Sequence, residues 1–291
     1  MLHFKDITLA DKEVIRSFTM CGYWQSCDLS FANLCSWWFL YRMQYAVKDG
    51  FLLFRFYTGT EQAYLMPVGT GDVRLVLEAL LEDALQVEVP FRMLGVSYEM
   101  RTQMEEAMPG KFIFEENRDY YDYIYLREQL ATLTGKKFQA KRNFLNKFRK
   151  EYPHYEYREL ITELVPECLR LADEWRRTND GEGDKALEAE KHSMVYALEH
   201  MEELDIRGGV LIVDGKVVAF TYGTAINQDT WNICVEKADT NYEGAYAMIN
   251  YEYANRIDEK YVYVNREEDL GLPGLRKAKL SYQPYLLLEK Y

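Results

Sequence analysis

The order of predicted helices and strands is repeated along this chain, and the repeat restricts the fold more than any single motif. In each half, two segments with apolar residues at helical spacing precede three segments that alternate as strands do. A helix, a strand, a helix and a strand complete each half. The first half extends from a helix at 9–20 to a strand at 111–115, and the second from a helix at 163–177 to a strand at 285–289. A doubled order of this kind is typical of two copies of one fold.

An Asp-Gly pair occupies the same place in each half, between the first and second predicted strands. These pairs are Asp49-Gly50 and Asp214-Gly215. Glycine accepts the positive φ of a tight antiparallel turn, so both pairs predict a β-hairpin. The matching turns therefore support the repeat independently of the order of helices and strands.

The repeated order matches that of the Gcn5-related N-acetyltransferase (GNAT) fold. We therefore predict an α/β protein (α+β, with mixed sheets) made of two tandem acyl-CoA N-acyltransferase (GNAT)-like domains. The N-terminal domain covers residues 1–125, and the C-terminal domain covers 126–291, including a basic helix at 136–150. The alternative is a single mixed-sheet domain with added elements, because the halves share element order and not residue identity.

Composition limits the class of protein. Acids outnumber bases by 47 to 35, for a formal charge of -12, so the surface as a whole repels nucleic acid and anionic membranes. Hydrophobic residues make up 48% of the chain, which is too many for a disordered protein. The longest uncharged run, at 29–41, is well short of the roughly 20 residues of a membrane span. Together with a start unlike a secretory signal, these features predict a soluble, cytoplasmic protein.

Cysteine and histidine usage argues against disulfide and metal frameworks. The five cysteines include no Cys-x-x-Cys pair, and an odd number of them fits a reducing compartment. The four histidines form no His-Glu-x-x-His motif. We therefore predict no metal site.

The segment Lys136–Lys150 departs from the acidic trend, because it holds seven lysines and arginines and no acid. It contains good helix formers and neither Gly nor Pro. At helical spacing, one apolar arc is formed by Phe138, Phe144, Leu145 and Phe148. Lys137 and Lys141 fall within this arc, so we expect both to point toward the protein body, where a lysine is costly unless it meets an anion.

Clustered bases favour a phosphate-rich ligand, because they displace counterions from nucleic-acid phosphates. The candidate tRNA-binding or phosphate-binding residues are Lys137, Lys141, Arg142, Lys147 and Lys150. The alternative is a solvated helix whose bases pair with the carboxylates of the protein itself.

A second dense cluster begins where the predicted strand 261–264 ends. One amide, a cation and three carboxylates occur within 265–269, followed by Gly271, Pro273 and Gly274 and by a basic helix. Polar side chains at a strand end face the cleft beside a sheet, which favours a functional site. A charged surface loop with ordinary capping is the alternative.

Three stretches resemble the phosphatidylglycerol lysyltransferase C-terminal domain family. They are Lys136-Lys137 with Lys141-Arg142-Asn143, Glu243-Gly244-Ala245 with Ile249-Asn250, and Asn265 through Lys279. Members resemble tandem acetyltransferase folds and are related to the Fem-type peptidoglycan aminoacyltransferases. The resemblance implies transfer of an aminoacyl group from a charged tRNA to a lipid or other acceptor. Characterised lysyltransferases carry a large membrane-spanning region that is absent from this sequence, so the acceptor stays open.

Under this hypothesis the reaction needs a carboxylate, cations and an amide near one strand edge. Glu236 could hold the aminoacyl ammonium or accept a proton from the acceptor. Asn265, Arg266 and Lys279 could polarise the ester carbonyl or orient the acceptor. Aminoacyl-tRNA would be the co-substrate, and the acceptor could be a small molecule, a lipid or a peptide.

Two other functions stay open. One is N-acyl transfer from acetyl-coenzyme A, for which Gly244 is the candidate cofactor-binding residue. The loop before it holds one glycine and the acids Asp239 and Glu243, which compete with a pyrophosphate for the helix N-terminus. The other is a non-enzymatic binding module that keeps the fold without the chemistry.

Overall fold

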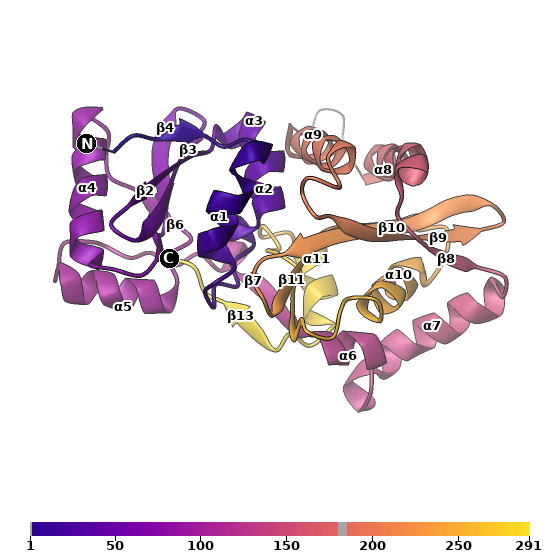
Figure 1. Cartoon of the computed structure of the whole chain (residues 1–291). Helices are drawn as coiled ribbons and strands as arrows, with labels where there is room; N and C mark the ends of the chain where they lie inside the picture. Colours follow the sequence, from indigo (N-terminus) through magenta and orange to yellow (C-terminus); the bar gives the residue numbers. More distant parts are fainter. Residues whose placement is uncertain (1, 180–184) are drawn as a thin grey trace.

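Two mixed sheets form the framework of the molecule, in a computed structural model that describes residues 2–179 and 185–291 (Figure 1). The first sheet has the order β1-β2-β3-β4-β6, with β5 paired to β3. Its strands are β1 (Lys5–Asp6), β2 (Gln44–Lys48), β3 (Phe51–Thr58), β4 (Glu61–Leu65), β5 (Val68–Gly69) and β6 (Met93–Leu94).

The second sheet has the order β13-β7-β12-β11-β10-β9-β8. Its strands are β7 (Asp122–Leu126), β8 (Glu156–Glu159), β9 (Arg207–Val213), β10 (Lys216–Ala225), β11 (Thr230–Ala238), β12 (Tyr263–Asn265) and β13 (Leu286–Leu288). In Figure 1 the first sheet lies at the left and the second at the right, with α1 (Lys12–Thr19) and α2 (Phe31–Ser36) drawn between them.

The two sheets repeat one topology. The strand β3 lies between β2 and β4 and is antiparallel to both, and β10 lies in the same way between β9 and β11. The next strand is parallel in each sheet, β6 against β4 and β12 against β11. The Asp-Gly turns also match, with φ of 50° at both aspartates and 83° and 79° at the glycines. The predicted fold of two tandem GNAT-like units is confirmed.

Helices cover both faces of the second sheet and connect it to the first (Figure 1). In the first half they are α1 (Lys12–Thr19), α2 (Phe31–Ser36), α3 (Trp38–Tyr41), α4 (Val73–Gln86) and α5 (Tyr98–Ala107). In the second half they are α6 (Arg127–Thr132), α7 (Gln139–Glu151), α8 (Val165–Asn179), α9 (Lys185–Glu199), α10 (Ala245–Ala254) and α11 (Pro273–Leu280). No helix in the described ranges is long and apolar enough to cross a bilayer.

The apolar core does not stop at the boundary between the halves. One cluster of buried side chains contains Leu52 and Phe54 of the first sheet together with Phe220 and Val235 of the second. A separate cluster lies under α6, α7 and α10. Because the first cluster is continuous, the two halves bury apolar surface against each other and pack as one body.

Backbone contacts also cross between the halves. The strand β7 follows the first half in sequence, yet it lies in the second sheet between β12 and β13 and is antiparallel to both. In return, Tyr291 exchanges two backbone hydrogen bonds with Val96, next to β6. The predicted strand at 111–115 is wrong, because these residues pair with no strand; Phe112 and Phe114 instead pack against the shared core. The predicted domain boundary at residue 125 falls within β7 and stays a prediction.

Gly244 explains how closely α7 packs on α10. It has a φ of 91° at the N-terminus of α10, and a Cβ there would lie 2.7 Å from the Phe144 carbonyl oxygen of α7. The backbone of α7 therefore lies directly against the N-terminus of α10.

We expect Gly244→Ala to cost more stability than Gly215→Ala. Both glycines have a positive φ, which costs an alanine about 1–2 kcal/mol, but a Cβ at Gly215 would meet nothing within 4 Å. The overlap with Phe144 should add about 1–3 kcal/mol at Gly244 only. Urea unfolding of both variants measures the difference, and equal losses would contradict the close approach.

Candidate functional site

The parallel strands β11 and β12 separate after a short pairing, and this opening is the centre of the candidate site. They pair from Thr230 opposite Tyr263 to Asn232 opposite Asn265, after which β12 ends and β11 continues to Ala238. In the same stretch the register of β11 against β10 shifts, and Cys234 is left without an opposite residue. Such a bulge re-aims the side chains that follow it.

Glu236 and Arg266 meet across this opening. Arg266 Nη2 donates to Glu236 Oε1 at 2.9 Å, and Asn250 Nδ2 of α10 donates to Glu236 Oε2 at 3.0 Å. The Arg266 guanidinium lies 4.7 Å from the ring centroid of Tyr282 and 5.6 Å from that of Tyr125. The structure thus joins two predicted site residues and adds an amide and two aromatic rings.

The basic helix α7 contributes Lys141 to the same place. Its Nζ lies 3.8 Å from the centroid of the Tyr282 ring. Burial, and then the nearby Arg266, lower the pKa of Lys141 to about 8. We call Lys141, Glu236, Asn250 and Arg266, with the rings of Tyr125 and Tyr282, the splay site.

Several polar atoms in and beside the splay site are buried and have no partner among the described residues. They are Arg266 Nη1, which is a donor, and Asn250 Oδ1 and Asn232 Oδ1, which are acceptors. Buried polar atoms are nearly always hydrogen-bonded, so such a group marks unused binding capacity. Its chemistry fits a ligand that carries both a carbonyl oxygen and N–H or O–H donors.

Asn265 and Lys279 lie beside the splay site and bind the loop that follows β12. Asn265 Nδ2 donates to Asp122 Oδ2 at 2.8 Å, and its Oδ1 accepts from the backbone N–H of Glu267 at 2.6 Å. Lys279 Nζ donates to the carbonyl oxygens of Arg266, at 2.6 Å, and of Glu268. Burial lowers the pKa of Lys279. These contacts position Arg266 and Glu267, whereas the predicted catalytic roles of Asn265 and Lys279 stay predictions.

Glu267 is a residue that sequence reasoning did not single out. Its Oε1 accepts from Asn33 Nδ2 of α2 at 2.9 Å and from Asn232 Nδ2 of β11 at 2.8 Å. Burial, and then the neighbouring Glu268, raise its pKa to about 8. The only available signal was the density of charge at 265–269, because Asn33 is more than 200 residues away in sequence.

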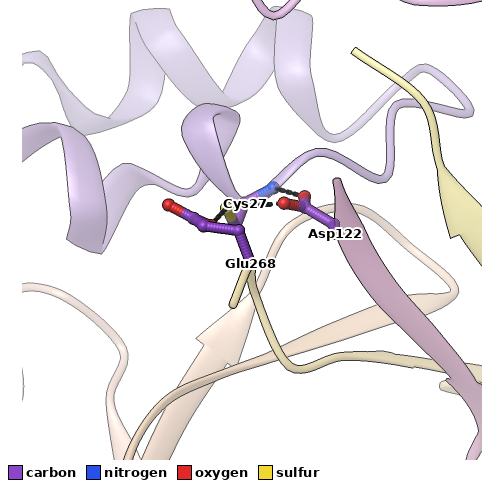
Figure 2. A group of neighbouring side chains, drawn as sticks. All are labelled: Cys27, Asp122 and Glu268. Atoms are coloured by element: carbon purple, nitrogen blue, oxygen red, sulfur yellow. Dashed lines mark hydrogen bonds between the residues drawn. The ribbon is translucent and has the colours of Figure 1, made fainter. Parts of the chain in front are cut away.

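A second polar cluster lies where the halves meet, and Figure 2 shows Cys27 between Asp122 and Glu268. Cys27 Sγ donates to Asp122 Oδ1 and Glu268 Oε2, both at 3.3 Å. Lys290 Nζ lies 2.7 Å from Asp122 Oδ1 and 2.8 Å from Asp28 Oδ2. We call Cys27, Asp28, Asp122, Glu268 and Lys290 the interface cluster.

The donor set of the interface cluster resembles a metal site, but its charges argue against one. Three ligand atoms, from Cys27, Asp122 and Glu268, lie within 4.8 Å of one another. Burial and the carboxylates raise the pKa of the Cys27 thiol well above its usual value, so the thiol keeps its proton. The Lys290 ammonium already supplies the cation, 3.7 Å from the sulfur. We assign no metal to this cluster.

The helical projection of the basic segment is confirmed for Phe138, Leu145 and Phe148, which are buried. Of the two lysines expected to face inward, only Lys141 points toward the protein body, since Lys137 is exposed and donates to Gln129. The reason is local: 136–138 form a separate 3-10 turn before α7, which shifts the projection. Phe144, predicted in the apolar arc, is 42% exposed.

The other candidate phosphate-binding residues differ in whether their charged groups already have partners within the protein. Arg142 donates to the carbonyl oxygens of Leu133 and Gly135, which closes the turn before α7. Lys147 pairs with Glu243, and Lys150 is exposed. Lys150 is therefore freer than Arg142 or Lys147 to meet an external anion.

Two tandem GNAT-like units with a polar site at a strand splay define a protein of the acyltransferase superfamily. The model of one family, described as "Phosphatidylglycerol lysyltransferase, C-terminal", matches residues 24–291. The chain therefore belongs to this family, and the resemblance inferred from the sequence is confirmed.

Several solved structures share this fold. A conserved protein of unknown function from Bacteroides thetaiotaomicron is 56% identical, with a TM-score of 0.98 over 100% of this chain and 98% of its own. L-PGS of Bacillus licheniformis is 16% identical, with a TM-score of 0.66 over 96% and 90% of the chains. FemX is 12% identical, with a TM-score of 0.61 over 99% and 97%. The last two show a shared fold.

A relative is also known among curated sequences. An uncharacterized protein of Mycoplasmoides gallisepticum is 23% identical over 171 residues, which are 58% of this chain and 54% of that protein. The chain thus spans about half the length of the curated relative that it matches.

We expect Lys290→Met to destabilise the protein by about 3–5 kcal/mol, because it leaves the buried carboxylate of Asp122 without its cation. The matched control is Lys48→Met, which breaks an exposed pair with Asp49 and should change stability by at most about 1 kcal/mol. Urea unfolding measures both. Equal and small losses would show that the interface cluster does not join the halves.

Proposed function

We propose that this protein transfers an aminoacyl group from aminoacyl-tRNA to an acceptor, with the splay site as the reaction centre. One observation carries the proposal: Arg266 Nη1 and Asn250 Oδ1 are both buried without a partner, on either side of Glu236. An aminoacyl ester needs one donor for its carbonyl oxygen and one acceptor for its amine. The splay site offers both.

The aminoacyl ester of a charged tRNA is already activated, so in this reaction the protein mainly has to position the two substrates. Arg266 Nη1 would donate to the carbonyl oxygen and stabilise the negative charge that develops on it. Lys141 would add a second positive charge at the same point. Glu236, held by Arg266 and Asn250, would face the α-ammonium of the aminoacyl group.

The helix α7 supports a tRNA as donor. It carries exposed bases on its outer surface, and its Lys141 reaches the splay site. A polyanion would contact Lys136 and Lys150 on the surface while its aminoacyl end lies at Lys141. Arg142 and Lys147 would contribute less, because both already have partners within the protein.

Coenzyme A is less well supported as the acyl carrier. The N-terminus of α10 is covered by the backbone of α7 at Gly244, and Glu243 places a carboxylate beside it. A pyrophosphate needs free backbone N–H groups and neutral or positive surroundings at this position. The acceptor is proposed only as a class: a molecule with a hydroxyl or amine, of which phosphatidylglycerol is the one that the family description suggests.

The reaction can be tested without knowing the acceptor. We expect the protein to form aminoacyl hydroxamates from pooled aminoacyl-tRNA and hydroxylamine. Arg266→Lys should lower the rate about 10²- to 10³-fold, because it removes the donor at Nη1 while it keeps the charge. Arg158→Lys, an exposed pair partner of Glu156, is the control. No hydroxamate above the level without protein would contradict the proposed function.

Binding of tRNA should depend on salt through α7. We expect Lys150→Ala to reduce the slope of log affinity against log salt by about one, as each lost phosphate contact does. Lys147→Ala should have a smaller effect because of its pair with Glu243. Filter retention at several salt concentrations measures the slopes, with Lys48→Ala in the first half as control. Binding that is absent or insensitive to salt would leave α7 as a structural element.

A further inference from the structure

Lys141 is a half-buried cation that lacks an anionic partner. Its Nζ lies over the ring of Tyr282, 3.8 Å from the centroid, and it makes no hydrogen bond or ion pair with any residue that the structure describes. The carboxylate of the splay site, Glu236, is already engaged, because one oxygen accepts from Arg266 and the other from Asn250. Burial of an ammonium group without an anion is costly, so a bound anion would stabilise it.

The splay site as a whole carries an excess of positive charge. Lys141 and Arg266 both lie against the Tyr282 ring, 3.8 and 4.7 Å from its centroid, and Glu236 is the one carboxylate that contacts them among the described residues. The two tyrosines of the site stay neutral, because burial raises the pKa of both. The site therefore fits a ligand that brings one negative charge. A lysine binds a phosphate well, since its ammonium acts as a compact point charge.

The position of Lys141 along the basic segment indicates where this phosphate comes from. Lys136 and Lys150, at the two ends of the segment, are exposed and are the proposed contacts to tRNA. Lys141 lies between them and is the base that reaches the splay site. In an aminoacyl-tRNA the phosphate nearest the ester belongs to the terminal nucleotide, and only the ribose separates the two groups. That phosphate would enter the splay site together with the ester.

We propose that Lys141 binds the phosphate of the terminal nucleotide of the donor while Arg266 binds the ester carbonyl; this inference rests on the proposed function. Lys141 is then the residue that makes the site prefer a nucleotide ester to other aminoacyl esters. The bound phosphate supplies the anion that Lys141 lacks within the protein.

The test compares two small donors that differ by one phosphate. One is 3′-O-aminoacyl adenosine, and the other is the same ester with a 5′-methyl phosphate, which carries a single charge as the phosphates of tRNA do. Hydroxylamine is the acceptor; it has no phosphate, so any dependence on phosphate comes from the donor. The variants are Lys141→Met and Lys141→Arg. The control is Lys260→Met, because Lys260 Nζ also lies over a tyrosine ring, 4.8 Å from the centroid of Tyr261, but is exposed.

We expect the unaltered protein and Lys260→Met to use the phosphorylated donor with a kcat/KM about 10- to 100-fold higher, as one charged hydrogen bond gives. Lys141→Met should bring the ratio of the two donors close to one, whatever its effect on the ester without phosphate. Lys141→Arg should keep most of the preference. A ratio near one in the unaltered protein, or a ratio that Lys141→Met leaves unchanged, would overturn the assignment.

The preference should also depend on pH, because only the ammonium form of Lys141 binds a phosphate. Burial and Arg266 lower its pKa to about 8, whereas Glu236 acts in the opposite direction. The neighbouring Lys279 is engaged by backbone carbonyl oxygens. The ratio of the two donors should therefore fall as the pH rises above about 8, and it should stay constant in Lys141→Arg, whose guanidinium keeps its charge. A ratio independent of pH in the unaltered protein would assign the phosphate to another cation.

Stability gives a readout without substrate. Since Lys141→Met removes a half-buried charge that has no anionic partner among the described residues, we expect its urea unfolding midpoint to be no lower than that of the unaltered protein. A lower midpoint would show that Lys141 is a structural residue.

A binding measurement separates this inference from the proposed function. Adenosine 5′-(methyl phosphate) carries no aminoacyl group. In calorimetric titration it should bind about 10- to 100-fold more tightly than adenosine to the unaltered protein, and no more tightly than adenosine to Lys141→Met. If it does so but no hydroxamate forms, the phosphate site stands and the proposed function is wrong. If hydroxamate forms without any preference for phosphate, the transfer activity stands and the role of Lys141 is wrong.

Discussion

The buried carboxylate of Asp122 is the point on which the arrangement of the two halves depends. It accepts the backbone N–H of Cys27 from the first half and the amide of Asn265 from the end of β12, both at 2.8 Å. Its other oxygen binds the Lys290 ammonium at 2.7 Å. A buried charge is costly unless it is paired and hydrogen-bonded, so these three segments can move apart only at a large cost in free energy. Because Asp122 begins β7, the same contacts hold this strand in the second sheet.

The splay site follows from this anchoring. Asn265 is fixed by Asp122, and the loop after it is fixed by Lys279, so Arg266 and Glu267 leave the end of β12 in opposite directions. One meets Glu236 beyond the bulge of β11, and the other meets Asn232 before it. The interface cluster and the splay site are therefore one connected network, in which the first supplies rigidity and the second keeps unpaired hydrogen-bonding groups for a ligand.

The bases of the segment Lys136–Lys150 differ in the contacts that they make. They divide between structural contacts and exposed positions. Arg142 stabilises the turn that begins α7, and Lys147 joins α7 to the loop before α10. Lys141 alone among the seven reaches the splay site, and burial lowers its pKa. A projection on one ideal helix cannot separate these roles, because the 3-10 turn at 136–138 changes which side chains face inward.

The sequence by itself determined the repeated order of elements and the hairpins at Asp49-Gly50 and Asp214-Gly215, because periodicity and turn chemistry act over a few neighbouring residues. It also placed Glu236 and Arg266 at strand ends and Lys141 on an inward face. Only the tertiary structure decided that 122–126 form a strand of the second sheet while 111–115 form none, since each depends on which edge is open in the folded chain. It likewise decided the partners Asn33, Asn250 and Lys290. Contacts between residues more than 200 positions apart, such as Asn33 with Glu267, arise from packing of the halves and leave no local pattern in the sequence.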